Sequence, residues 1–373
     1  MNEEEIYKNF IDWLRTGWWD LPEADELMPL IKARYTAEEA ALLTGMPFKG
    51  RSIEELAKMK GMNPEELGPK LEAFARKSVV FQSKRGDSVR YSLNDSFFTF
   101  YRASFWRGDR DQSTVKIASL VNKYFYRGFM DDFKNVHSKM LRAIPINRTI
   151  EDTRQVLPHE DVVKVVENMD YFCVSTCSCK HRKNIDGEHP DCKHPDEVCL
   201  HFNTLAHYMV NNGMAREITK EETLEILHKA ADSGLVHGLG NWQADSDTIC
   251  NCCSCCCQWF EAYHKLGHSR SVDPSNYKVQ VKAESCKGCA LCVKHCPMDA
   301  LQLRHSSSAK NEFHKVAKPD PDLCIGCGVC AHKCPTDSIL LIQKDVIADK
   351  LVDFREYSSY FEAEKQKASS QEK

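Results

Sequence analysis

Two copies of one cysteine pattern near the end of this 373-residue chain constrain its fold more than any other feature. Both copies read C-x2-C-x2-C-x3-C-P, the spacing that holds cubane [4Fe–4S] clusters in proteins. Three thiolates separated by two residues each wrap one face of a cubane, and the fourth cysteine reaches across to a second cluster. The ligands predicted in this way are Cys286, Cys289, Cys292 and Cys296 in the first copy and Cys324, Cys327, Cys330 and Cys334 in the second.

The same pattern predicts how the thiolates are shared between two clusters. Under crossed ligation, Cys334 completes the cluster of the first copy and Cys296 completes the cluster of the second. Zinc binding by C-x2-C pairs is the alternative, and two complete copies disfavour it. The segment 277–344 resembles the bacterial two-cluster ferredoxins, with an insert around 304–318 that lengthens the loop between the copies.

The charge of this segment bears on its partner. Residues 277–344 contain ten Lys/Arg and six Asp/Glu, a net charge of +4. A basic surface near the clusters favours an acidic docking partner, here a redox protein or an oxidoreductase complex. An ordinary solvated surface is an equally good interpretation of the same charges.

Eleven further cysteines lie between Cys173 and Cys257, and none precedes Cys173. An odd total of 19 in a long chain without an export signal argues against a disulfide framework. So many thiols in one stretch indicate metal sites rather than core packing alone. The metal ligands predicted among them are Cys173, Cys177, Cys179, Cys192, Cys199, Cys250, Cys252 and Cys255.

Several arrangements of these middle cysteines stay open. Eight thiolates would hold one or two further Fe–S clusters, and the others would pack, hold a less usual cluster or do redox chemistry. Adjacent cysteines project in different directions, so the run 250–257 is not expected to grip one ordinary cubane. Zinc or a mixed site is the rival interpretation. For the nearby histidines, a surface or hydrogen-bonded role is favoured over ligation; they are His181, His194, His201, His207, His228 and His237.

The order of cysteines over residues 145–344 is similar to that of anaerobe proteins described as 4Fe–4S ferredoxin-type iron–sulfur binding domain proteins. The shared features are C-x3-C-x-C, C-x6-C, the segment Gly234–His237 and the run 250–257, followed by the paired ferredoxin motifs. The resemblance implies cluster binding and electron transfer and names no substrate. A helix with a capping box at Thr219 is expected to be scaffold between the cysteine groups.

The first part of the chain is free of cysteine and helical in pattern. Capping boxes at Thr36 and Ser52 and a further helix precede a hairpin, an order that resembles a winged helix-turn-helix over residues 25–94. Glu65 and Glu66 begin the helix that would enter the major groove, where they would face phosphates. DNA is therefore a disfavoured partner, and a docking or packing role is preferred.

Residues 97–144 are rich in aromatic side chains. They favour a helical core or a subunit interface over a flavin or quinone pocket, because no phosphate-binding glycine loop accompanies them. After Phe361 no large apolar residue occurs, and this tail is expected to be disordered.

We expect the chain to lie in a reducing compartment, because its clustered cysteines indicate metal sites, and not to insert into a membrane. It has 42% hydrophobic and 28% charged residues and a formal charge of −4, ordinary for a water-soluble protein. No run of 18 apolar residues occurs, and the acidic N-terminus is unlike a signal peptide. We expect a cytoplasmic protein of anaerobic metabolism, since oxygen damages exposed cubanes.

Together these observations predict an α+β protein. Its expected parts are a helical, winged-helix-like domain (1–144), a Cys-rich domain (145–276), a 2[4Fe–4S] ferredoxin domain (277–344) and a C-terminal helix with a disordered tail (345–373). The expected function is relay of single electrons as a component of an anaerobic oxidoreductase system. The alternatives are a redox-sensing transcription regulator and a middle domain that is itself catalytic, although no catalytic residue is identified.

Overall fold

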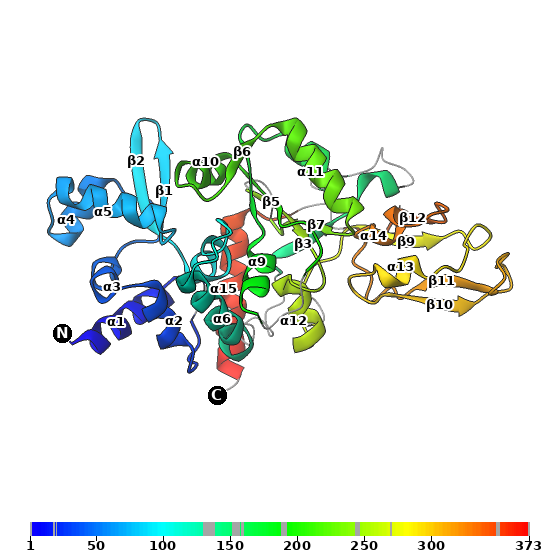
Figure 1. Cartoon of the computed structure of the whole chain (residues 1–373), viewed down its shortest axis with the longest axis horizontal. Helices are drawn as coiled ribbons and strands as arrows, with labels where there is room; N and C mark the ends of the chain where they lie inside the picture. The colour runs from blue at the N-terminus through cyan, green and yellow to red at the C-terminus, as the bar shows by residue number, and fades with distance from the viewer. Residues whose placement is uncertain are drawn as a thin grey trace.

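The computed structural model describes residues 2–17, 19, 21–129, 139–150, 157, 160–187, 192–242, 247–268, 271–347 and 351–371. These residues form a mixed helix and sheet fold (Figure 1). A six-stranded antiparallel sheet lies between N-terminal helices at one end of the molecule and two small β-ribbons at the other. Among these residues, no helix is both long and apolar enough to span a membrane.

The N-terminal helices begin where the sequence predicts. The side chains of Thr36 and Ser52 each accept a hydrogen bond from the backbone N–H of the third helical residue, which is a glutamate. The carboxylate of that glutamate accepts a hydrogen bond from the backbone N–H of the capping residue, which completes a capping box. Pro69 does not interrupt its helix, which runs for 13 residues. The helices are α1 (Glu3–Arg15), α2 (Leu27–Arg34), α3 (Ala37–Leu43), α4 (Ile53–Lys60) and α5 (Pro64–Arg76).

The predicted hairpin follows as β1 (Val80–Arg85) and β2 (Ser88–Leu93). Its base is held by the rest of the chain, because the Tyr208 hydroxyl donates to the Val80 carbonyl at 2.9 Å. On β2, Arg90 donates to the Gly50 carbonyl and pairs with Glu55 at 3.1 Å. Helices and hairpin occur in the expected order, while the winged-helix assignment stays a prediction.

The aromatic-rich stretch is helical over most of its described length. It contains a π-helix (Phe98–Ala103), α6 (Gln112–Tyr124) and a second π-helix (Phe125–Phe129), while residues 130–138 lie outside the described residues. Phe100 and Phe125 are completely buried in the largest hydrophobic core. The stretch is therefore a helical core, with one exception at a cavity described below.

The central sheet positions most of the middle cysteines. Helices α8 (Val162–Glu167) and α11 (Lys220–Asp232) pack together, and α11 contacts β4, β5 and β7. Thr219 caps α11 as predicted, but the Glu222 carboxylate pairs with Arg216 instead of closing the box. The strands, in spatial order, are β3 (Leu141–Ile144), β7 (Val236–Gly240), β8 (Thr248–Cys252), β5 (Glu197–Phe202), β4 (Phe172–Thr176) and β6 (Arg216–Ile218).

Three helices beside the sheet connect it to its surroundings. Helix α10 (Asn203–Asn211) packs on β4 and β5 and also on the N-terminal hairpin. Helix α9 (Ser178–Ile185) packs on α6, and α12 (Gln258–Leu266) follows the cysteine run. Strand β3 of the sheet lies just before the expected domain boundary at residue 145, and that boundary stays a prediction.

The C-terminal segment forms two antiparallel ribbons with a short helix after each cysteine loop. The insert between the copies is a hairpin. Helix α15 (Phe354–Gln371) then returns along the middle of the molecule, where Tyr357 packs on Trp242 and Phe361 packs on Trp19 (Figure 1). The helix continues past Phe361, where the sequence predicts a disordered tail. The ribbons are β9 (Tyr277–Val281) with β12 (Ile339–Gln343) and β10 (Leu301–His305) with β11 (Lys315–Pro319), and the helices are α13 (Leu291–Lys294) and α14 (Val329–His332).

Candidate metal centres

The first ferredoxin quartet combines one loop with a cysteine from the second copy. Burial raises the pKa of Cys292 to about 11, with smaller contributions from the nearby thiols of Cys286, Cys289 and Cys334. Burial also acts on Cys334, but N–H and hydroxyl donors at Thr336 and Ser338 outweigh it and lower the pKa of this thiol. This is the grouping that crossed ligation requires of the first cluster.

The second quartet encloses a hollow of about 330 Å³ whose lining includes Cys296, Cys324, Cys327 and Cys330. Burial raises the pKa of Cys327 to about 12, with smaller contributions from Cys296 and Cys324. The backbone N–H of Ala300 points at the Cys296 sulfur, 3.3 Å away. Four thiols around an apolar hollow, with N–H donors on the sulfurs, fit a cubane cluster.

The two quartets differ in exposure. Cys289 of the first quartet is exposed, whereas Cys327 and Cys330 of the second are buried. The second loop is braced by the middle region, because the Ile146 N–H donates to the Cys327 carbonyl at 3.2 Å and the Ser275 N–H to that of Ile325 at 3.0 Å. One candidate cluster site thus faces the surface, and the other faces the rest of the protein.

Seven middle thiols line a separate cavity of about 620 Å³ between α9, α12 and the sheet. One of them, Cys253, also belongs to a second group of thiols described below, and the other six define what we call the six-thiol cavity. Aromatic side chains form much of the remaining wall, and they are Phe97, Tyr101, Trp106 and Trp259. Part of the aromatic-rich stretch therefore borders a thiol-lined site, which the sequence pattern did not predict. The six thiols that belong to this cavity alone are Cys177, Cys179, Cys199, Cys250, Cys252 and Cys257.

Two helices begin at this six-thiol cavity. Cys177 is the N-cap of α9, and Cys257 is the N-cap of α12. Burial raises the pKa of Cys257, but bonds from Cys179 and Cys252 and the N–H groups of the first helical turn outweigh it, so the pKa lies well below its usual value. Positive helix ends at both caps favour thiolates, the form that binds metal.

Buried cations complete the electrostatics of the six-thiol cavity. The Arg182 guanidinium is buried over the rings of Tyr101 and Phe125, 5.2 and 5.7 Å from their centroids. Its three side-chain nitrogens have no hydrogen-bond partner in the described part of the chain. A bond with Cys257 and burial raise the pKa of Cys179, and the Arg182 charge opposes them. An uncompensated buried cation beside thiols fits an anionic thiolate cluster.

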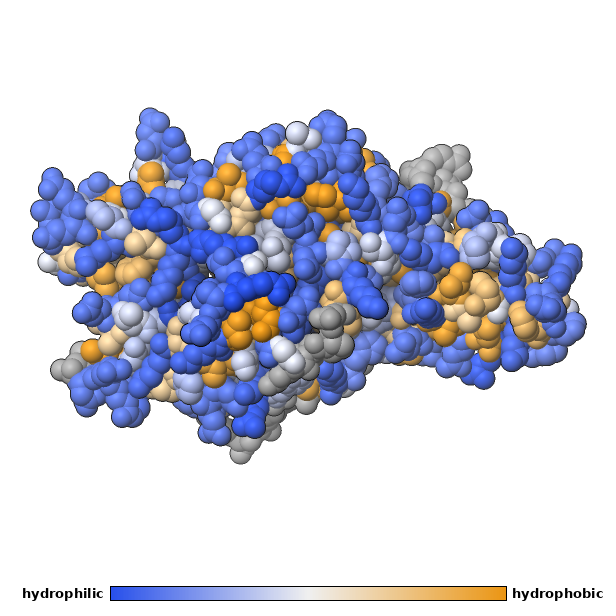
Figure 2. Space-filling model, in the orientation of Figure 1, coloured by the Kyte–Doolittle hydropathy of each residue, from blue (hydrophilic) through white to orange (hydrophobic). Residues whose placement is uncertain are grey.

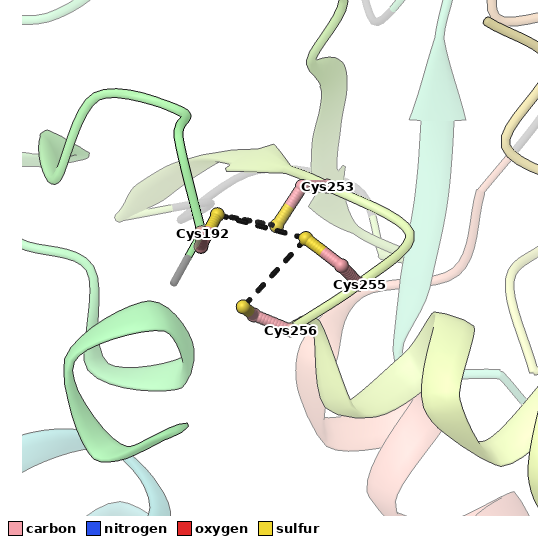
Figure 3. A group of neighbouring side chains, drawn as sticks. All are labelled: Cys192, Cys253, Cys255 and Cys256. Atoms are coloured by element: carbon pink, nitrogen blue, oxygen red, sulfur yellow. Dashed lines mark hydrogen bonds between the residues drawn. The ribbon is translucent and has the colours of Figure 1, made fainter. Parts of the chain in front are cut away.

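Four middle thiols, among them the Cys253 that also lines the cavity, form a tighter group in the same region (Figure 3). Its four sulfur atoms all lie within 4.8 Å of one another, and it is the one compact group of metal-ligating atoms in the described residues. Lys180 lies between this group and the six-thiol cavity; burial lowers its pKa, but thiols of both groups outweigh that effect. The members are Cys192, Cys253, Cys255 and Cys256.

The structure sorts the predicted middle ligands unequally. Cys192 and Cys255 lie in the tight group, and five of the other predicted ligands line the cavity. Cys173 is completely buried on β4 in a hydrophobic cluster with Trp106, away from both groups. Sequence reasoning did not select Cys253, Cys256 and Cys257. In a run of closely spaced cysteines, the sequence does not indicate which site each side chain faces.

Histidines near the site are held by hydrogen bonds. His201 is buried between the hydroxyls of Ser175 and Thr248, each 3.0 Å away. His237 contacts the Asn251 side chain at 2.6 Å, and burial lowers its pKa to about 4. These contacts agree with the hydrogen-bonded role favoured from sequence for both residues.

A buried ion pair joins the two helices that begin at the cavity. Lys183 of α9 lies 2.7 Å from Glu261 of α12, and their side chains are 0% and 2% exposed. Glu261 also accepts a hydrogen bond from Tyr126 and pairs with Lys265 at 2.9 Å. The pair fixes α9 and α12 relative to each other, and with them Cys177 and Cys257.

Comparison with known proteins identifies the C-terminal module. Residues 285–338 match the family model described as a 4Fe-4S dicluster domain. The chain therefore carries a 4Fe–4S ferredoxin-type domain beside a Cys-rich region. No curated protein and no solved structure matched the chain.

Proposed function

We propose that this protein relays single electrons through two ferredoxin-type [4Fe–4S] clusters and one further cluster in the six-thiol cavity, as a component of an anaerobic oxidoreductase system. The observation that carries the proposal is the continuous packing between the second ferredoxin quartet and the cavity. Each cluster supplies one-electron redox chemistry when bound. The chain supplies the thiolates, the N–H donors and the distance between the centres.

Helix α12 provides the link from the cavity to the ferredoxin module. It begins at Cys257, and His264 near its other end contacts the Pro297 carbonyl at 2.9 Å, directly after Cys296. Seven residues of α-helix span roughly 10 Å. Centres at the two ends of so short a helix are close enough for electron tunnelling without a diffusing carrier.

The exposed quartet is the proposed port for a redox partner. Leu291 beside Cys289 is 38% exposed and Phe313 is 55% exposed. Figure 2 shows apolar side chains gathered on the visible face of this module. An apolar patch within a segment of net charge +4 suits an acidic redox protein that docks close to the first cluster.

Cluster content and reductive titration of the anaerobically purified chain test the relay. Three cubanes require about twelve irons and twelve sulfides per chain and three one-electron steps. EPR spectra of the reduced protein should show magnetic coupling between neighbouring clusters. A content of about eight irons, with no cluster signal beyond the ferredoxin pair, would exclude the middle cluster and the relay through it.

The redox-sensing regulator is the alternative, and the described contacts do not favour it. Glu65 and Glu66 are exposed at the start of α5, and Arg90 is engaged with Glu55. Lys84 and Arg85 leave only a small basic surface on the hairpin. Sequence-specific DNA binding that responds to cluster oxidation would support the regulator over the relay.

A further inference from the structure

The four thiols of the tight group point toward one common centre (Figure 3). Cys192 lies 3.8 Å from Cys253 and 3.6 Å from Cys255, measured between sulfur atoms. Cys255 lies 3.7 Å from Cys256. These three separations are nearly equal and the others do not exceed 4.8 Å, although Cys192 is 61 residues away from Cys253 in the sequence.

This spacing has a direct meaning in coordination chemistry. Four sulfur atoms placed tetrahedrally at about 2.3 Å from a single metal ion lie about 3.8 Å from one another. In a cubane each thiolate binds a different iron, so the cluster holds the four cysteine sulfurs much farther apart. The observed separations match one ion and leave no room for a cubane.

The ferredoxin quartets of the same chain provide an internal reference for these separations. They match a dicluster family, and their thiols affect one another electrostatically without thiol–thiol hydrogen bonds in the described residues. The second of these quartets surrounds a hollow of about 330 Å³. The tight group differs from them, because neighbouring sulfur atoms in it lie only 3.6 to 3.8 Å apart, so the chain contains two different arrangements of four thiols.

We propose that Cys192, Cys253, Cys255 and Cys256 bind a single tetrahedral metal ion without inorganic sulfide. Four thiolates close the coordination shell, which is typical of structural zinc, and a lone iron accepts the same ligands. The ion ties the loop before β5 to the turn between β8 and α12. The turn borders the cavity through Cys253, and the Pro195 carbonyl of the loop accepts a hydrogen bond from Lys180 in the cavity wall, so the ion acts as a clamp for that site. This proposal does not depend on electron relay.

The turn offers a matched pair of variants for the test. Cys255 and Ser254 are adjacent and both exposed, so neither substitution opens a cavity in the core. Zinc, iron and acid-labile sulfide are measured in full-length protein purified without oxygen. Cys255→Ala should lower zinc or iron by about one ion per chain and leave sulfide unchanged. Ser254→Ala should retain both.

Two outcomes of the metal and sulfide measurement would overturn the proposal. Loss of about four irons together with about four sulfides in Cys255→Ala would assign the thiols to a cubane. An unchanged content of zinc, iron and sulfide would mean that Cys255 binds no metal. Either result leaves the relay to be judged separately, by the iron content and reductive titration of the wild-type chain.

The wild-type protein gives a second readout that needs no variant. If the ion is zinc, X-ray absorption at the zinc edge should show four sulfur atoms at about 2.3 Å and no iron neighbour. If it is iron, the oxidised protein should show the EPR signal of isolated high-spin ferric iron. Nitrogen or oxygen ligands on zinc, or the absence of both ions, would contradict a tetrathiolate site.

Discussion

The ferredoxin module and the Cys-rich middle region both offer cysteine ligands, but they bring these cysteines together in different ways. In the module, each predicted quartet takes three thiols from one short loop and the fourth from the matching loop, whose thiol lies near the other three. In the middle region, the thiols that meet at one cavity come from α9, β5, β8 and the start of α12. The module is therefore defined by local spacing, whereas the middle sites exist only once the sheet has formed.

This difference separates what each region requires in order to hold metal. Loops of the module carry their own N–H donors and need little from outside. The middle sites depend on the packing of distant segments, so damage to that packing should release their metal first. Variants that remove ligands or packing from one region at a time can therefore establish whether the two regions hold metal independently.

The largest expected effect is loss of clusters from the module in double variants that test the crossed ligation. Cys296 and Cys330 belong to one quartet, so Cys296→Ala/Cys330→Ala should remove one cluster and leave about four irons in the module. Cys292 and Cys296 belong to different quartets, so Cys292→Ala/Cys296→Ala should leave no intact [4Fe–4S] cluster there. Iron and sulfide contents together with EPR spectra distinguish the two variants.

The reverse outcome would mean uncrossed ligation, with each loop holding its own cluster. In both variants the zinc content should stay unchanged, because the tight group shares no ligand with the module. Loss of zinc from either variant would show that the module and the middle region depend on each other for metal.

The second effect concerns the buried ion pair behind the middle cavity. Glu261→Gln removes the carboxylate that lies 2.7 Å from the buried Lys183 ammonium, which should lower the free energy of unfolding by about 3 kcal/mol. Lys183→Met should cost less, because Glu261 keeps Lys265. Thermal denaturation measures which of the two variants loses more stability. The double variant should recover part of the stability lost in Glu261→Gln.

The metal content of the same variants tests directly whether the middle region and the ferredoxin module hold metal independently. Since the ion pair positions the helices that begin at Cys177 and Cys257, Glu261→Gln should release iron from the middle region before the module. Equal release from both regions would show that the sites unfold together and that the proposed independence of the module is wrong.

Much of this architecture is predictable from sequence because its determinants are local. The capping boxes at Thr36 and Ser52, the hairpin after α5 and the dicluster motif are confirmed. Each depends on residues within one turn or one loop. The insert between the two ferredoxin copies leaves the quartets intact for the same reason.

The division of the middle thiols was not predictable because it depends on tertiary structure. Cys252 and Cys253 are neighbours in sequence and both line the cavity, yet only Cys253 also belongs to the tight group. The fourth thiol of that group, Cys192, comes from a loop far away in sequence. Likewise, the pattern of residues 97–144 predicts a core but not that Trp106 and Tyr101 border a candidate metal site.

A smaller effect is expected from the lysine between the two middle sites. The buried Lys180 ammonium donates to the Pro195 carbonyl at 2.8 Å and lies near thiols of both groups. Its charge stabilises the reduced, more negative form of a cluster. Lys180→Met should therefore lower the reduction potential of the middle cluster by the order of tens of millivolts.

Potentiometric EPR titration measures this shift, with the exposed Lys193→Met as the matched control. The ferredoxin potentials should not move in either variant. Burial lowers the pKa of Lys180, but the nearby thiols outweigh this effect and raise the pKa. The lysine should therefore remain charged near neutral pH, and the change in reduction potential should not depend on pH there. A shift confined to the ferredoxin clusters would contradict the placement of the middle cluster.

The smallest effect is expected at Cys173, the one predicted ligand that the structure places apart. Its neighbours Phe172 and Val174 belong to a different hydrophobic cluster, as the alternation of a strand requires, while Cys173 packs with Trp106. Burial raises its pKa to about 12, which disfavours the thiolate that metal binding needs. Cys173→Ala should keep every iron, sulfide and zinc and lose about 1 kcal/mol of stability. Cys177→Ala, at the cavity, should lose the middle cluster, and equal metal loss from both variants would place Cys173 among the ligands after all.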